Sequence, residues 1–564
     1  MVKSMNKRLE LVWPSKDRIL LGLDESGEPI WGAGEDLEPR LLVQLESAGQ
    51  IKPDNMDNLY EQGDNLLIKG DNLLALKALE RHFAGKIKFI YIDPPFNTGS
   101  AFEHYEDGYE ETVWLSLLRD RLLLLKELLR NDGFICVHID DTETCYLKTI
   151  LNEIFGAQNW VTTIFIQARY PSKTLKADRP FHMLVEQVHI YKKSDQATIE
   201  QKQKEYDISK FNWQIKVRRP TKKLTLGGKI VECFGGNNYS IERVRASKVG
   251  LKEVWASGKV LDINSTGRFF RDYLIGRVKQ DGLGVLYKVY GIGDDDLGYR
   301  YITGPKREGA TRGKYYQGLP ANAKSGLRSR KEALTNFWDL AASVGNCRHE
   351  GGVEFRSGKK PEILILNLLD IFTKEDDWIL DSFLGSGTTA AVAHKMRRKW
   401  IGIELREHAQ TLCLPRLKRV VSGDDQTGVS KQIGWKGGGG FRYSVLGESL
   451  FKKDKETGLV MINPKYTNGP LVAAVCNLED FALNNDSILH GILGNIYVHI
   501  TEEKVTQVYL DSIVERLPDD KSLTIYYLKR AANLELPNNV KLKRIPKELQ
   551  IPRYLARKGK GDVE

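Results

Sequence analysis

The first stretch of the sequence that could do chemistry is Asp93-Pro94-Pro95-Phe96, which directly follows the apolar run IKFIYI at 87–92. Proline fixes φ and lacks an N–H donor, so the carbonyls of this stretch can face a ligand as acceptors. Asp93 and a prolyl carbonyl together would suit one planar NH2 group, and Phe96 offers an aromatic face for stacking. The alternative is a turn in which Asp93 caps the next segment and the prolines only end the strand.

The second stretch is DSFLGSGTT at 381–389, between the apolar run WILD and a predicted helix. Glycines let a ligand approach the backbone, and a helix N-terminus offers free N–H groups to an anionic end such as a carboxylate. No Lys follows the last Gly, so this is not a Walker loop. Glu404 stands 19 residues after Gly385, a spacing typical of an acid that binds ribose hydroxyls. Together they predict a nucleoside-containing cofactor; the alternative is a tight strand–helix turn without a ligand.

The elements that must position these residues are predicted by the alternation of apolar runs and amphipathic segments. Such alternation is typical of a parallel α/β sheet, which binds ligands at the carboxyl ends of its strands. Neither half of the pattern has enough strands for a sheet of ordinary size, so we expect the two halves to form one sheet. Strands are expected at 65–69, 87–92, 134–139, near 161, at 184–191, 378–381 and 399–404, and helices at 72–83, 111–130, 142–154, 361–373, after 387 and up to about 421.

A basic insertion, 195–335, interrupts this pattern. It holds 28 Lys and Arg against 15 Asp and Glu, a net charge of +13, whereas the rest of the chain carries −3 of the overall +10. Such a segment suits phosphate contacts of a polyanion, with some side chains left for base edges. The alternative is a solvated, loop-rich insertion. Aromatic residues are interleaved with its basic residues at Phe211, Trp213, Trp255, Phe269, Phe270, Tyr315 and Tyr316.

The predicted organisation of the 564 residues is an N-terminal extension at 1–60, one half of an α/β domain at 61–194, the insertion at 195–335, the second half at 336–440, and a small C-terminal α/β domain at 441–564. The last boundary is set by the four glycines at 437–440. No apolar run reaches the roughly 18 residues of a membrane helix, and the first residues lack the apolar core of a signal peptide, so a cytoplasmic protein is expected. Six scattered cysteines without a CxxC pair argue against a zinc site and a disulfide framework.

The combination of DPPF and FLGSGTT resembles the DNA amino-methyltransferases that use S-adenosyl-L-methionine. Their order here, with the insertion between them, resembles the β arrangement of that family. The stretches GDNLLALKAL, IDPPFNTGSAFEHYEDG, WLSLLRDRL, HIDDTE and GGGFRY resemble the modification (Mod) subunit of Type III restriction–modification systems. The resemblance covers roughly 60–195 and 336–445 and is specific at DPPFNTG and FLGSGTT. It implies a Rossmann-like methyltransferase sheet split by a target recognition domain.

The resemblance also implies roles for individual residues. Asp93 and the Pro94 carbonyl hold the N6 amino group of a target adenine, with Pro95 fixing the turn and Phe96 stacking on the flipped base. The residues implied in cofactor binding are Asp71, Lys360, Pro361, Asp381, Phe383, Gly385, Gly387, Thr388 and Glu404. Among them Glu404 takes the ribose, while Asp381, Phe383, Gly385 and Gly387 surround the methionine part. Two alternatives stay open: Asp71 as the N-cap of a helix, and Lys360 as a solvated lysine ahead of a helix that starts with Pro361.

The implied chemistry is a direct methyl transfer. The lone pair of an adenine amino group is delocalised into the ring, and acceptors at Asp93 and Pro94 would aim it at the sulfonium methyl. The base must leave the duplex to reach such a pocket, and the loop 97–108, with Phe102 and Tyr105, is a candidate gate, or else a surface loop. No Pro-Cys occurs, which argues against cytosine C5 methylation. Asp93, where relatives that act on cytosine N4 often have Ser, favours adenine.

The other polar clusters receive structural interpretations. Asp140-Asp141-Thr142-Glu143 is expected to cap a helix, and His138, His182 and His189 show no metal-ligand spacing. The leading hypothesis is a site-specific DNA adenine-N6 methyltransferase, the Mod-like subunit of a Type III system. Its expected partners are double-stranded DNA, a second copy of the chain, and a restriction subunit with helicase and nuclease activity. The alternatives are a solitary regulatory methyltransferase and a catalytically idle DNA-binding specificity subunit.

Overall fold

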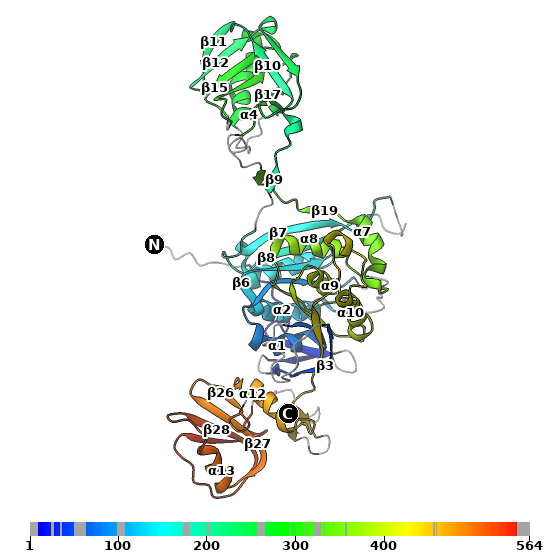
Figure 1. The fold of residues 1–564 in the computed structure, drawn as a ribbon, viewed down its shortest axis with the longest axis vertical. Coiled ribbons are helices and arrows are strands. Elements are labelled where there is room, and N and C mark those ends of the chain that lie inside the picture. Colours follow the sequence, from blue (N-terminus) through cyan, green and yellow to red (C-terminus); the bar gives the residue numbers. More distant parts are fainter. Residues whose placement is uncertain are drawn as a thin grey trace. The chain divides into compact units, whose positions relative to one another are not determined.

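The computed structural model describes residues 9–23, 28–33, 36–49, 64–98, 108–172, 181–199, 203–256, 265–293, 295–310, 312–320, 329–331, 333–355, 358–454, 457, 459–484 and 486–549. The chain divides into two compact units. The first comprises Met1–Ile199 and Thr335–Glu564, and the second, here the insertion unit, comprises Glu200–Leu334 (Figure 1).

The first unit is built around a ten-stranded mixed sheet. The six strands β6, β5, β20, β21, β4 and β22 lie side by side and run parallel to one another. In spatial order the sheet consists of β19 (Phe337–Asp339), β7 (Trp160–Gln167), β8 (Val185–Lys192), β6 (Leu129–Ile139), β5 (Ile87–Ile92), β20 (Trp378–Asp381), β21 (Lys399–Glu404), β4 (Asn65–Lys69), β22 (Gly440–Leu446) and β3 (Leu42–Gly49).

Strands from the two sides of the insertion are interleaved in this sheet. β20 and β21, which follow the insertion in sequence, lie between β5 and β4, which precede it. The expectation that both halves build one α/β sheet is therefore confirmed. From β5 the chain proceeds to β6 on one side, and from β20 it proceeds to β21 on the other side. The boundary between β5 and β20 is thus a topological switch point, the place where open α/β sheets bind ligands.

Helices cover both faces of the sheet (Figure 1). One hydrophobic cluster joins α1, α2 and α3 to one face, and a second joins α8, α9 and α10 to the other. All six residues of β5 are buried, which explains its uninterrupted apolar sequence. The helices are α1 (Asn72–Phe83), α2 (Glu111–Leu128), α3 (Thr144–Leu151), α7 (Ala341–Asn346), α8 (Glu362–Phe372), α9 (Thr388–Lys395), α10 (Leu414–Ser422) and α11 (Ser430–Ile433).

Two segments that were expected to lie outside the α/β domain belong to its sheet. β3, within the expected N-terminal extension, pairs antiparallel with β22. β22 itself pairs parallel with β4, so the expected boundary between 440 and 441 cuts through a strand and is wrong at that point. The glycines at 437–440 lead into this strand. Glycine-rich composition signals a break in regular structure, but it does not reveal whether the next strand joins the same sheet.

The insertion unit is an antiparallel β structure with a core of its own. Five of the seven interleaved aromatics, Phe211, Phe269, Phe270, Tyr315 and Tyr316, lie in this unit's buried clusters, whereas Trp255 is 62% exposed. Its main sheet has the order β11 (Lys222–Leu226), β12 (Lys229–Phe234), β15 (Leu286–Tyr290), β16 (Tyr299–Thr303), β17 (Gly313–Gln317) and β14 (Lys252–Ala256). Alongside are the ribbon of β10 (Trp213–Val217) and β13 (Tyr239–Arg243), the pair β9 (Gln203–Glu205) and β18 (Ser329–Lys331), and the helices α4 (Ser265–Phe269) and α5 (Val278–Asp281).

The C-terminal part of the first unit holds a separate five-stranded sheet. Its two longest strands are β27 (Ile496–Val505) and β28 (Ser522–Arg530), with α13 (Gln507–Val514) between them in sequence. The sheet also contains β25 (Ala482–Leu483), β26 (Gly491–Leu493) and β29 (Val540–Arg544), and α12 (Asn468–Leu478) packs on it. Two hairpins, β1 (Ile19–Leu23) with β2 (Pro29–Gly32) and β23 (Phe451–Lys453) with β24 (Val460–Ile462), complete the unit. Among the residues that the structure describes, no helix is long and apolar enough to cross a membrane.

Candidate active site

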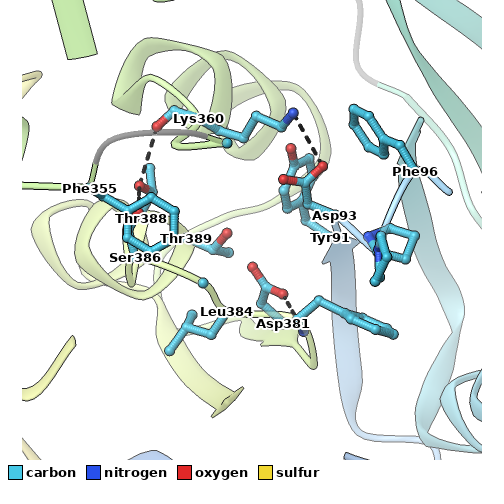
Figure 2. Close-up of a pocket in the computed structure, with 15 residues that line it drawn as sticks. Tyr91, Asp93, Phe96, Phe355, Lys360, Asp381, Leu384, Ser386, Thr388 and Thr389 are labelled. Carbon is cyan, nitrogen blue, oxygen red and sulfur yellow. Dashed lines mark hydrogen bonds and ion pairs between the residues drawn. The ribbon is translucent and has the colours of Figure 1, made fainter. Parts of the chain in front are cut away.

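Two carboxyl groups at the ends of adjacent strands line one cavity. Asp93 follows β5 directly, and Asp381 is the last residue of β20. Figure 2 shows both side chains turned into the cavity. The lining combines both predicted stretches with residues before α8: Tyr91, Asp93, Pro94, Pro95, Phe96, Phe355, Gly358, Lys360, Asp381, Phe383, Leu384, Gly385, Ser386, Thr388 and Thr389. The tertiary structure therefore brings together segments nearly 300 residues apart in sequence at the switch point of the sheet.

The Asp93–Phe96 turn is held by neighbouring elements on both sides. The indole N–H of Trp114, on α2, donates to the Pro95 carbonyl at 2.8 Å. Asn97 has a left-handed backbone (φ 60°), and its side chain donates to Glu143 Oε1 at 2.7 Å. Glu143 was expected to cap a helix. It occupies the N-cap position of α3 without a side-chain capping bond, and its carboxylate fixes the end of the turn instead.

The glycine-rich loop is shaped by its own acid and by the end of β21. Asp381 Oδ1 accepts from the Phe383 N–H at 2.9 Å, and Glu404 Oε2 accepts from the Gly385 N–H at 2.7 Å. Gly387 is the N-cap of α9 with φ 80°, a left-handed conformation that favours glycine. Glu404 is 4% exposed and does not line the cavity. In this structure Glu404 braces the loop, and its contact with a ribose stays a prediction.

A fully buried charge network that the sequence did not indicate supports the same loop. Arg416, on α10, donates to the Ser386 carbonyl at 3.0 Å and to Thr388 Oγ1 at 2.9 Å. The Arg416 Nη2 atom lies 2.7 Å from Oε1 of Glu362, the first residue of α8. Lys395 of α9 also pairs with Glu362, at 2.8 Å. The loop conformation is thus tied to three helices by groups that have no access to water.

Lys360 is a component of the site and not a solvated lysine. Its Nζ lies 3.3 Å from Asp93 Oδ1 and 3.1 Å from Glu186 Oε2, and its side chain is only 12% exposed. The ammonium also lies 4.6 Å from the centre of the Phe96 ring (Figure 2). The Lys360 carbonyl accepts from Thr388 Oγ1 at 3.2 Å, so Lys360 contacts both predicted stretches: Asp93 of the first and Thr388 of the second. Glu186 belongs to no motif, and only its position in the fold identifies it.

Burial and charge set the ionisation of these groups. Burial raises the pKa of Asp93, and the neighbouring Lys360 opposes this shift. Burial also raises the pKa of Asp381, to about 7, against hydrogen bonds from Thr389 and the Phe383 N–H. For Lys360, burial alone would lower the pKa, but Asp93 and Glu186 outweigh it and the pKa is raised. Near neutral pH the site therefore holds a charged Lys360 and an Asp381 close to its titration midpoint.

A second cavity adjoins the first and shares Phe96, Gly358 and Lys360 with it. It lies on the side of β6 and β8, and its wall is more polar. The additional lining residues are Thr98, His138, Asp140, Thr142, Ile166, Arg169, Phe181, His182, Met183, Glu186, Val344, Lys359, Pro361 and Leu364. Two neighbouring spaces separated by Lys360 and Phe96 can hold two reactants side by side.

Two predicted cofactor residues lie at helix starts. Asp71 is the N-cap of α1: its carboxylate accepts from the Leu74 N–H at 3.1 Å and pairs with Arg121 at 3.1 Å. It does not line the first cavity, so its capping role is observed and its contact with a cofactor stays a prediction. Pro361 is the N-cap residue of α8.

The expected gate lies mostly beyond what the structure describes. Phe102 and Tyr105 fall within 99–107, outside the described residues. Among the described residues, no group of three or more His, Cys, Asp or Glu side chains is arranged to hold a metal ion.

Comparisons with known proteins show what the chain is similar to. Residues 87–413 match the family of DNA methylases. The chain is 32% identical over 402 residues to the probable Type III restriction–modification enzyme HindVI Mod subunit of Haemophilus influenzae, covering 66% of this chain and 52% of that protein. It is 25% identical over 397 residues to the Type III StyLTI Mod subunit of Salmonella typhimurium, covering 64% and 53%. The chain thus spans about half the length of these relatives. Among solved structures, the PvuII DNA methyltransferase (cytosine-N4-specific) aligns with a TM-score of 0.32 at 14% identity, covering 66% of this chain and 90% of that one.

Proposed function

The chain belongs to the DNA methylase family, and on this premise we propose that it transfers the methyl group of S-adenosyl-L-methionine to N6 of adenine in DNA. One observation carries the proposal: Asp93 and Asp381 open into a single cavity from adjacent strand ends. An acceptor for an amino group and an acid for a cationic cofactor are thereby within reach of one reaction centre.

The first cavity fits the cofactor by its chemistry. Phe355, Phe383 and Leu384 give it apolar and aromatic walls, and Asp381 adds a carboxyl group to that of Asp93. A carboxylate in an apolar surrounding favours a cationic ligand, because the opposite charge offsets the cost of burying it. The bound cofactor would supply an electrophilic methyl group on its sulfonium. Glycines of the loop leave the backbone open to close approach.

The second cavity would take the target base. A base inside a duplex cannot reach it, so the adenine must be flipped out of the helix. Asp93 and Pro94 line the first cavity, so the amino group would point from the second cavity toward the first. There Asp93 and the Pro94 carbonyl would accept the two N–H groups of the amine and aim its lone pair at the methyl group. Phe96, shared by both cavities, would stack on the base. The proton released from the amine passes to Asp93, whose raised pKa suits a proton acceptor in a buried site.

The partners follow from the charge distribution and from the relatives. The insertion unit would bind double-stranded DNA, since the basic excess of the chain is concentrated in 195–335. The two relatives are named as Type III Mod subunits. We extend that role to this chain, acting as a homodimer in the cytoplasm with a restriction subunit as partner. A solitary methyltransferase and an idle DNA-binding subunit are the competing functions.

The function is tested by expressing the chain alone and sequencing the host DNA by a method that detects modified bases. The expected result is N6-methyladenine in one defined sequence, in the absence of any restriction subunit. Methylated cytosine N4 would contradict the assignment of the base, and unmodified DNA would favour the idle subunit.

Asp93→Ala should lower methyl transfer by at least about 10²-fold, because the amine loses a preorganised acceptor. Cofactor affinity should change much less than transfer, since Asp381 and not Asp93 is assigned to the cationic cofactor. Transfer is measured with labelled cofactor, and affinity by calorimetry. Asp519→Ala, at an exposed turn of the C-terminal sheet, is the matched control. Full activity of Asp93→Ala would refute the catalytic assignment.

A further inference from the structure

Glu186 is a largely buried acid in the site that no sequence motif contains. It is the second residue of β8, and its Oε2 lies 3.1 Å from Lys360 Nζ and 3.0 Å from His138 Nε2. Its side chain is 12% exposed. A carboxylate at such a position must be compensated by partners, because burying an unpaired charge is very costly.

The sheet topology explains how Glu186 reaches the site. β8 runs antiparallel to β6, with His138 opposite Val188 and Ile139 opposite Gln187. The first residues of β8 therefore lie beside the last residues of β6, at the same edge as Asp93. Asp93 and Asp381 lie at the ends of parallel strands, whereas Glu186 lies near the start of an antiparallel one.

A chain of close contacts reaches Glu186 from the side of the sheet. The Tyr91 hydroxyl lies 2.8 Å from His138 Nδ1, within hydrogen-bond distance. His138 Nε2 in turn lies 3.0 Å from Glu186 Oε2, a contact without good hydrogen-bond geometry. For Glu186, burial alone would raise the pKa, but Lys360 and His138 outweigh it and the pKa is lowered. Glu186 is thus a fixed anion.

Lys360 therefore stands between two carboxylates with different tasks. Among the described residues, Asp93 Oδ1 is buried without a hydrogen bond of good geometry, and the Lys360 ammonium 3.3 Å away is its ion-pair partner. In the proposed function the oxygens of Asp93 must accept the target amine. The ammonium lies beside that acceptor and has to move when the amine binds. If the ammonium left Asp93 without another anion nearby, it would remain a buried unpaired cation, which is strongly unfavourable.

We propose that Glu186 is a positioning residue for Lys360: it retains the ammonium when the target amino group displaces it from Asp93. The inference rests on the proposed methyl transfer and adds a specific step to it. Glu186 acts after the cofactor and DNA have bound, so its loss should lower the transfer rate and leave both affinities almost unchanged.

The test uses the full chain and a double-mutant cycle of Glu186→Gln and Lys360→Met. Single-turnover transfer of labelled methyl is followed at saturating cofactor and DNA, at about pH 8.5, above the ordinary range of a carboxyl pKa. Glu186→Gln should lower the rate by about 10- to 100-fold, with dissociation constants of cofactor and DNA within about threefold. In the Lys360→Met background the same change should no longer lower the rate, because no ammonium needs a second anion. Asp195→Asn, an exposed carboxylate just beyond the other end of β8, is the matched control.

Each outcome decides between the two claims. Transfer by wild type with a non-additive cycle supports the inference. Additive effects, an unchanged Glu186→Gln rate, or equal losses of affinity and rate would overturn it, since they indicate a purely structural role or none. Lys360→Met without detectable transfer would also overturn it, because a group that only has to move aside is dispensable. Wild type without transfer would overturn the proposed function, and this inference with it.

Discussion

Two acids at neighbouring strand ends are placed in different electrostatic surroundings, and this separates their tasks. Asp93 has Lys360 at 3.3 Å. Asp381 makes no ion pair with another described residue, and burial raises its pKa to about 7. An acid whose pKa is raised in the absence of a cation should respond strongly when a cationic ligand arrives.

Cofactor affinity should therefore depend on pH through Asp381. Below about pH 7 the carboxyl is protonated, and a cationic ligand must displace the proton to pair with it. Affinity should rise with pH, by up to about tenfold per unit between about pH 5.5 and about pH 7. Calorimetric titration with S-adenosyl-L-methionine across this range measures the effect.

Asp381→Asn is the control, since its affinity should be weaker and nearly independent of pH. An equal pH dependence in this variant would assign the effect to another group. For folding, the same shift has the opposite consequence. A pKa raised in the folded state gives stability that is present below the unfolded value of 3.8 and is lost as pH rises through about 7.

At the scale of elements, the glycine-rich loop depends on charged residues of three helices that do not themselves line the cavity. Glu362, Lys395, Asp425 and Arg416 are fully buried and joined by contacts of 2.7–2.8 Å. Arg416 extends the network to the loop by donating to the Ser386 carbonyl. α8, α9 and α10 thus hold the loop through charges whose partners cannot be replaced by water.

Glu362→Gln should destabilise the first unit by about 3–5 kcal/mol, because Lys395 and Arg416 would keep only Asp425 as a buried anion. The midpoint of urea unfolding, followed by circular dichroism, measures the loss. Glu80→Gln breaks the partly exposed Lys77–Glu80 pair on α1 and should cost less than about 1 kcal/mol. Equal losses for the two variants would show that the buried network contributes no more than a surface ion pair.

At the scale of the whole molecule, the candidate site lies in the first unit, whereas the basic excess of the chain lies in 195–335. The insertion unit buries five of its seven interleaved aromatics in its own core, so those rings are not available to nucleic acid. Exposed basic residues without an ion pair to any described residue follow the strands of its ribbon: Arg218 and Arg219 after β10, and Arg245 and Lys248 after β13. Because the strands are antiparallel, these pairs lie at opposite ends of the ribbon.

Replacing Arg218 and Arg219 together by Ala should weaken DNA binding at all sequences. Each lost phosphate contact should reduce the slope of log affinity against log salt by about 1. Fluorescence anisotropy with duplex DNA from about 0.05 to about 0.2 M salt measures the slope. Lys504 and Lys529, exposed on β27 and β28, give the matched double-Ala control. An unchanged slope in the Arg218/Arg219 variant would remove this end of the ribbon from the DNA interface.

Much of the fold was predictable because its signals are local. The buried strand 87–92, the helix after Gly70-Asp71, and the loop at 381–389 all appear where the pattern places them. The last two strands of the sheet, β22 and the edge strand β3, were not assigned to it. After the buried Leu42, β3 alternates exposed and half-buried residues. This alternation predicts a strand but not its partner, because pairing depends on segments nearly 400 residues away.

The sequence by itself determined the chemistry of the site: Asp93 with two prolines, the glycine loop, and the concentration of positive charge in one insertion. Only the tertiary structure decided which further groups act on that chemistry. Glu186 reaches Lys360 because β8 reverses direction beside β6, a relation that no spacing along the chain records. His138, expected to be structural, becomes a partner of Glu186 for the same reason. A motif can be recognised because its residues are close together in sequence. The residues that contact the motif side chains come from other strands, and only the folded sheet shows which strands are neighbours.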